Sequence, residues 1–239
     1  MPNWITPGSE SPFQLFSQSH VSALVLFIFG LCGVGILALK SRKRSNGNIN
    51  NAVRWTLLGI LIVSELSYQI WAFAYGLWEV TAYLPLHLCS VASLLGIVSL
   101  ITMRPSLIKI NFFIGILPAI FALVTPDLLY DYQHYRFWRF FLHHMAIPWT
   151  SLFLVISTSA TITWKDMWKT FGMLIAYASI VGFLNVFLQS NYLYLRNPPD
   201  ASTLLNWFGE GWWYIISLTL ITLICFSLLV VIFRIFNKS

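Results

Sequence analysis

The sequence predicts an all-α, polytopic membrane protein with seven transmembrane helices, its N-terminus outside and its C-terminus in the cytoplasm. Three observations predict this fold class. The 239-residue chain is 58% hydrophobic and only 9% charged, whereas about a quarter of an ordinary soluble domain is charged. Its apolar residues form continuous runs, not the alternating pattern of a β-barrel. Each run is about 20 residues long, which is the length that crosses a bilayer. A soluble enzyme and a disordered chain are both excluded.

Charged and turn-forming residues bound the expected spans. A single membrane domain covers residues 1–239, with spans at about 21–39, 53–75, 85–103, 108–125, 138–158, 168–189 and 212–233. The first span is expected to be an anchor and not a cleaved signal peptide, because its basic cluster follows the apolar run. Pro85 suits the first turn of the third helix, where a missing N–H costs nothing. Pro148 is expected to kink the fifth helix.

The distribution of charge predicts the orientation in a plasma membrane. If the basic loop after the first span is cytoplasmic, Arg136, Arg139 and Arg196 fall outside, and the other eleven of the fourteen Lys and Arg fall inside. This asymmetry follows the positive-inside rule. The net charge of +6 therefore reflects topology, and no nucleic-acid partner is implied. Because the cysteines and histidines lack metal-ligand spacing, neither a metal site nor a cofactor is predicted.

Polar side chains enter the outer half of four spans, where they are costly and mark a site by default. They are Glu65 and Gln69 on the second span, His87 and Cys89 on the third, Arg136, Arg139, His143 and His144 on the fifth, and Asn185, Gln189 and Tyr192 on the sixth, with Asn191 between the last two. We expect these residues to line one polar cavity that opens to the outer leaflet.

Each of these residues also has a purely structural interpretation. Asn185 and Gln189 are equally suited to hydrogen-bonding neighbouring helices. Arg136 and Arg139 suit interfacial anchoring, and Glu65 suits pairing with a buried cation or histidine. A lone cysteine is usually a packing residue. Four polar stripes at one depth are nevertheless more than the packing of seven spans requires.

The chemistry open to this set is covalent acyl transfer. An imidazole can take the proton of the Cys89 thiol, and the thiolate can attack an ester carbonyl. Glu65 or Asn185 would orient the imidazole. The alternative is a small proton-coupled transporter, or a lipid- or solute-binding membrane protein, that uses Glu65 and the histidines without catalysis. A non-catalytic partner of cell-envelope machinery is a third possibility.

Four short motifs carry a resemblance to a known family. They are Leu84-Pro85-Leu86-His87-Leu88-Cys89, Thr125-Pro126-Asp127, Phe140-Phe141-Leu142-His143-His144, and Asn191-Tyr192-Leu193-Tyr194-Leu195 followed by Pro198-Pro199. In these motifs the chain resembles the YwaF family of bacterial integral membrane proteins. It is similar, more distantly, to eukaryotic transmembrane protein 164, which is regarded as a lipid acyltransferase that uses a Cys and a His in the membrane. The resemblance implies Cys89 as nucleophile and His144 as base, with His143 as the second candidate.

We therefore expect a Cys-dependent acyltransferase or acyl hydrolase that acts on a membrane phospholipid at the outer leaflet. Arg136 and Arg139 form a basic face suited to the phosphate. The remaining residues expected to contact substrate are His87, Gln69, Asn185, Gln189, Asn191 and Tyr192.

Overall fold

The computed structural model describes residues 4–8, 12–44, 47–201 and 203–236; Lys238, counted above among the inner bases, lies outside them. Within these ranges the chain is all-helical, and one isolated β-bridge joins Pro12 to Tyr130. The helices are α1 (Gln18–Arg44), α2 (Gly47–Ala74), α3 (Leu88–Thr102), α4 (Pro105–Val124), α5 (Tyr135–Thr158), α6 (Trp164–Leu188) and α7 (Gly211–Phe236), with the 3-10 helices η1 (Tyr192–Tyr194) and η2 (Leu204–Trp207) between α6 and α7.

Six of the α-helices are long and apolar enough to cross a membrane, which confirms the predicted all-α, polytopic membrane fold. The seventh, α3, has 15 residues and is therefore about 22 Å long, shorter than the hydrocarbon core of about 30 Å. Most of the other helices extend beyond the expected spans. The reason is that helical hydrogen bonding continues through charged interfacial residues such as Lys40 to Arg44.

The start of α3 differs from its prediction. Pro85 lies in a turn before the helix, where the Leu86 N–H donates to the Leu84 carbonyl over 2.8 Å. His87 then caps the helix in an extended conformation, with φ −66° and ψ 148°. The expectation that Pro85 occupies the first helical turn was therefore wrong. As a result Cys89 is the second residue of α3, closer to the helix end than the sequence suggested.

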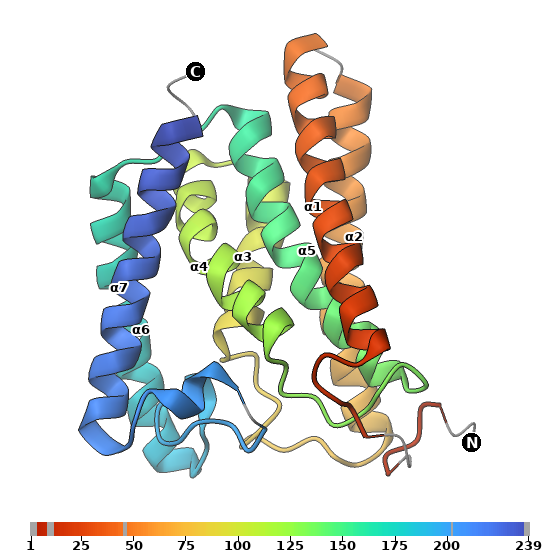
Figure 1. Ribbon diagram of the computed structural model, residues 1–239, viewed down its shortest axis with the longest axis vertical. Helices are drawn as coiled ribbons and strands as arrows, with labels where there is room; N and C mark the ends of the chain where they lie inside the picture. Colours follow the sequence, from red (N-terminus) through yellow and green to blue (C-terminus); the bar gives the residue numbers. More distant parts are fainter. Residues whose placement is uncertain (1–3, 9–11, 45–46, 202, 237–239) are drawn as a thin grey trace.

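Helix α5 is the central element of the bundle, and α1, α2, α3 and α4 pack around it (Figure 1). Where α3, α4 and α5 meet, Gly96 permits a close approach: a β-carbon there would lie 3.3 Å from Leu61 and 3.4 Å from Asn111 and Thr150. The Asn111 side chain donates to the Ala92 carbonyl across this junction, over 3.0 Å. Helices α6 and α7 form a pair at one side of the bundle and are far less buried.

Four segments gather at one end of the bundle: the N-terminal segment and the connections α2–α3, α4–α5 and α6–α7 (Figure 1). The N-terminal segment is held there by Trp71, whose indole N–H donates to the Ile5 carbonyl over 2.8 Å. At the opposite end, Lys109 of α4 forms an ion pair of 3.0 Å with Asp166 of α6. The described chain starts at the first end and finishes at the second.

Candidate functional site

A cavity of about 970 Å³ lies between the α6–α7 pair and helices α2 to α5, beneath the connection from α6 to α7. This volume is at the upper end of the range of small-molecule sites, about 300–1,000 Å³. Seven of the residues expected at the site line it, namely Gln69, His87, Cys89, Arg136, Arg139, His143 and His144. The other five, Glu65, Asn185, Gln189, Asn191 and Tyr192, are not among its lining residues.

Cys89 lies at the N-terminal end of α3 with its side chain half-buried, and its thiol is free of any disulfide. The first backbone N–H groups of a helix have no intrahelical partner, so this end of α3 favours negative charge. The cavity thus contains a thiol beside a polar helix end.

His144 is held in one tautomer by the backbone. Its Nδ1 lies 2.8 Å from the Phe140 carbonyl oxygen, and because a carbonyl only accepts, Nδ1 carries the proton. Nε2 is therefore the unprotonated nitrogen. The imidazole is buried, with its ring centroid 4.1 Å from that of Phe140. This is the tautomer that a general base requires.

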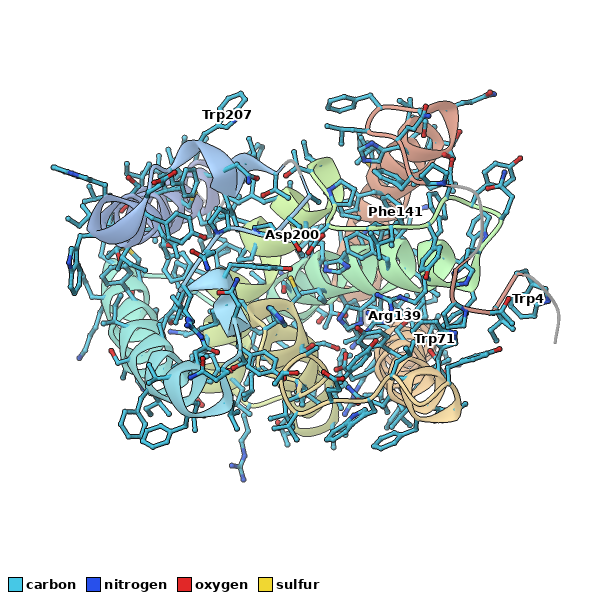
Figure 2. The ribbon with its side chains drawn as sticks, turned by 90° about the horizontal axis from the view of Figure 1, so that it is seen from below. Trp4, Trp71, Arg139, Phe141, Asp200 and Trp207 are labelled. Atoms are coloured by element: carbon cyan, nitrogen blue, oxygen red, sulfur yellow. The ribbon has the colours of Figure 1, made fainter. Side chains whose placement is uncertain are left out.

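His143 belongs to a different cluster. Its Nε2 lies 3.6 Å from Glu65 Oε2, and Arg139 Nη2 lies 3.5 Å from the same oxygen. Arg139 also donates from Nε to the Ser64 carbonyl over 3.0 Å. In Figure 2 Arg139 and Trp71 both lie between α5 and α2. Glu65 is thus paired with a cation and a histidine, and the described structure shows no contact between Glu65 and His144.

Arg136 differs from Arg139 in having no acidic partner among the described residues. Its guanidinium lies 4.6 Å from the ring centroid of Tyr68 and 4.9 Å from that of Trp71. Its Nε is buried without a hydrogen-bond partner, and the side chain lines the cavity. Buried polar groups are normally hydrogen-bonded. The guanidinium thus lies at the cavity between two aromatic rings, with one N–H, that of Nε, left without a hydrogen-bond partner.

The expected polar stripe on α6 does not continue through Tyr192, because α6 ends at Leu188 and Gln189 turns left-handed with φ 53°. Asn185 instead binds the returning chain: its amide donates to the Tyr192 carbonyl over 2.9 Å and accepts from the Tyr192 N–H over 2.9 Å. Asn191 accepts from the Arg196 N–H over 3.0 Å. These four polar residues build the connection after α6, so the prediction of one helical face was wrong.

Tyr192 nevertheless reaches the segment that precedes His87. Its hydroxyl donates to the Val80 carbonyl over 2.6 Å and accepts from the Leu84 N–H over 3.0 Å. The ring centroid of His87 lies 5.2 Å from that of Tyr192 and 5.1 Å from that of Tyr194. The connection after α6 thus positions His87 at the cavity; Asp200 of this connection lies over the middle of the bundle in Figure 2.

Tyr68, Asp127 and Tyr194 are among the polar cavity residues that were not predicted. The Tyr194 hydroxyl donates to Asp127 Oδ2 over 2.9 Å. Burial, followed by the nearby Asp127 carboxylate, raises the pKa of Tyr194 above its usual range, so this hydroxyl stays protonated. Asp127 and Tyr194 belong to two of the four family motifs, which was the available signal, whereas Tyr68 belongs to none of them.

Comparison with protein-family models gives a match to the TMEM164 family over residues 15–230. The chain belongs to the TMEM164 family. The matched region of this TMEM164-family protein extends from before α1 into α7 and includes the residues that line the cavity. No curated protein and no solved structure matches the chain.

Proposed function

We propose that this TMEM164-family protein is a Cys-dependent membrane acyltransferase or acyl hydrolase that acts on phospholipid. One observation carries the proposal: Cys89 and His144 line the same cavity, and His144 has its proton on Nδ1. The described residues show no hydrogen bond between Cys89 and His144, so transfer of the thiol proton to Nε2 requires the two side chains to come together in the substrate complex. Neither partner requires a metal or cofactor for this step.

The reaction would proceed in two stages. Transfer of the thiol proton to His144 Nε2 produces the thiolate of Cys89, which attacks the ester carbonyl of the phospholipid. The tetrahedral intermediate collapses, the C–O bond breaks, and the leaving alkoxide takes the proton from His144. The acyl group is then a thioester on Cys89. In the second stage His144 deprotonates water or a second lipid hydroxyl, which attacks the thioester and releases the thiolate.

The two arginines have different roles in this proposal. Arg136 binds the phosphate, because its guanidinium lines the cavity and lacks an acidic partner among the described residues. The charge of Arg139 is balanced by Glu65, so Arg139 is a positioning residue that fixes α5 against α2. Glu65 and His143 belong to the same support. Gln69 and His87 contribute polar cavity wall next to the reacting groups.

We further propose seven crossings, in which α3 and the turn before it act as a short span, with the N-terminus outside and the C-terminus in the cytoplasm. The opposite ends of the described chain support an odd number of crossings. The cavity mouth would then face the outer leaflet of a plasma membrane. The four motifs would place the chain in the YwaF-like bacterial branch of the family.

The test is acyl transfer in phospholipid vesicles. We expect the purified wild-type protein to form lysophospholipid and to carry a hydroxylamine-sensitive acyl label, and Cys89→Ala to lose both. His144→Ala should lower the rate by a factor of about 10² to 10⁴. Cys32→Ala is the matched control, since Cys32 is exposed on α1 and does not line the cavity. Wild-type activity in Cys89→Ala would refute the proposal.

The alternative function, that of a transporter, would require a pathway for the substrate through the protein. The cavity ends at Phe226, whose ring centroid lies 5.2 Å from that of Phe113 and 6.4 Å from that of Phe171. A closed end of this kind supports a blind site. Substrate accumulation that survives Cys89→Ala and collapses with the proton gradient would favour the transporter.

A further inference from the structure

The cavity has two chemically different parts. The polar part lies against α2, α3 and α5 and contains Cys89, His144 and Arg136. The second part lies against the faces of α6 and α7 that line the cavity. On α6 it is lined by Leu174, Ala178 and Gly182, which are spaced by four residues and therefore share one helix face. We call this second part the α6–α7 pocket.

Three hydroxyl groups on the wall of the α6–α7 pocket are already hydrogen-bonded within their own helices. Ser179 donates to the Ile175 carbonyl over 2.9 Å, Thr219 to the Ile215 carbonyl over 2.8 Å, and Thr222 to the Leu218 carbonyl over 2.8 Å. Each hydroxyl proton is therefore already used within its own helix. The hydroxyl groups of Ser179, Thr219 and Thr222 therefore offer no free donor, in contrast to the Nε of Arg136 in the polar part.

The depth of the pocket matches one leaflet. Its lining on α7 extends from Ile215 to Phe226, which is about 16 Å along a helix that rises 1.5 Å per residue. Half of a bilayer's hydrocarbon core is about 15 Å. Phe226 is buried and packs on Phe113 and Phe171, closing the far end. The pocket is thus a blind apolar slot as long as one lipid chain in one leaflet.

The volume is sufficient for one long chain. If a methylene group fills about the same space as a water molecule, about 30 Å³, an eighteen-carbon chain fills about 500 Å³. The whole cavity holds about 970 Å³. One chain would therefore fill about half of it, and the polar part of the cavity stays free for a headgroup.

We infer that the α6–α7 pocket binds a single long acyl chain of the phospholipid, with Ala178 on its wall and Phe226 as the floor that sets the chain length. The statement that the bound chain is the acyl chain that is transferred rests on the proposed function. The statement that the pocket binds a chain is independent of it, because no residue that lines the pocket takes part in the chemistry.

The experiment measures chain binding without catalysis. In a Cys89→Ala background, the purified full-length protein is illuminated with 1-acyl lysophospholipids that carry a diazirine at the chain end, with chains of eight and sixteen carbons. Labelled peptides are mapped by mass spectrometry. The variant Ala178→Phe places a bulky ring inside the pocket. Its matched control is Ala176→Phe, two residues away on α6, since Ala176 is exposed and does not line the cavity.

We expect the sixteen-carbon probe to label α7 around Phe226. Ala178→Phe should reduce this labelling by about tenfold or more, equivalent to about 1.4 kcal/mol, and leave the eight-carbon probe labelling near Gly182, which also shows that the variant is folded. Ala176→Phe should change neither. Phe226→Leu should admit a longer chain and move the label deeper. Equal losses in Ala178→Phe and Ala176→Phe, or labelling confined to lipid-facing residues such as Phe183 and Leu220, would overturn the inference.

The two proposals fail separately in this design. Labelling inside the pocket combined with no acyl transfer by the wild-type protein would retain the pocket and refute the enzyme. Acyl transfer combined with labelling outside the pocket would retain the enzyme and refute the pocket.

Discussion

The buried cluster of Glu65, Arg139 and His143 should contribute measurably to the free energy of unfolding through its electrostatic interactions. Glu65 Oε2 lies 3.5 Å from Arg139 Nη2 and 3.6 Å from His143 Nε2, and these side chains are at most 10% exposed. At an effective dielectric constant of about 20, two unit charges at that 3.5 Å separation attract by about 5 kcal/mol. Desolvation offsets much of this while both charges are present. Removing one of them leaves the other buried and unpaired, which costs about 3–5 kcal/mol.

We therefore expect Glu65→Leu and Arg139→Met each to lower the free energy of unfolding by about 3–5 kcal/mol. The double variant should lose much less than the sum, because no uncompensated charge remains between Glu65 and Arg139. What it still loses is the Arg139 hydrogen bond to Ser64 and the contact of its guanidinium with the Tyr68 ring, 4.2 Å from the centroid. Together these are worth about 2 kcal/mol.

The assay is reversible unfolding in mixed lipid–detergent micelles, followed by circular dichroism and analysed as a double-mutant cycle. The Lys109–Asp166 pair is the control, since its side chains are 25% and 19% exposed and its coupling should be only about 0.2–1 kcal/mol. If the losses from Glu65→Leu and Arg139→Met add within about 0.5 kcal/mol, the two groups do not act as a buried pair and the reasoning fails.

Two further predictions concern other parts of the fold. Gly30→Ala on α1 should destabilise the protein by about 1–2 kcal/mol, because its new methyl group overlaps the Trp149 ring, 2.6 Å from Cε2. This overpacking outweighs the gain in helix propensity. Gly33→Ala, with open space around it, is the control and should be neutral or stabilising in the same unfolding assay. Burial lowers the pKa of His134, so the unfolded state binds the proton first and the stability due to neutral His134 is lost as the pH falls below about 6.5. Protonation of Nδ1 removes the acceptor for the Arg136 N–H, now at 3.1 Å. The protection factors of the amides at the start of α5 should therefore fall on acidification in the wild type and stay unchanged in His134→Gln.

Composition and hydropathy were sufficient to predict the fold class, because a chain that buries its helices in lipid needs long apolar runs. The failure at α3 has a physical reason. The apolar run from Pro85 is continuous with the helix, but the turn formed by Leu84 and Leu86 uses backbone groups that a helix would need. Hydropathy does not distinguish an apolar turn from an apolar helix.

At the site, the sequence indicated which residue types gather but not their partners. His143 and His144 are neighbours in the sequence, and their roles are separated only by tertiary contacts: Glu65 reaches the first and the Phe140 carbonyl fixes the second. The same holds for Asn185, which a helical pattern placed toward the cavity. Its position in the last turn of α6 instead lets it cap a chain reversal, and the site of that reversal was not visible in periodicity.

Arg136, which lines the cavity and has no acidic partner among the described residues, offers the most direct test of the substrate's headgroup. A charge-assisted contact to phosphate is worth about 1.5–3 kcal/mol, or about tenfold to 150-fold in affinity. The phosphate is remote from the reacting ester and binds equally in the ground and transition states. Arg136→Gln should therefore raise KM by that factor and leave kcat nearly unchanged. Arg136→Lys should be intermediate, because lysine keeps the charge but loses the planar fork.

Arg196→Gln is the matched control, since Arg196 is an exposed arginine at the same end of the protein that does not line the cavity. The measurement is the rate of acyl release as a function of lipid mole fraction, for a phospholipid and for a monoacylglycerol of the same chain. The monoacylglycerol has no phosphate, so Arg136→Gln should not change its KM. An equal rise in KM for both lipids would show that Arg136 supports the cavity wall and does not bind the headgroup, and the assignment of Arg136 to the phosphate would be wrong.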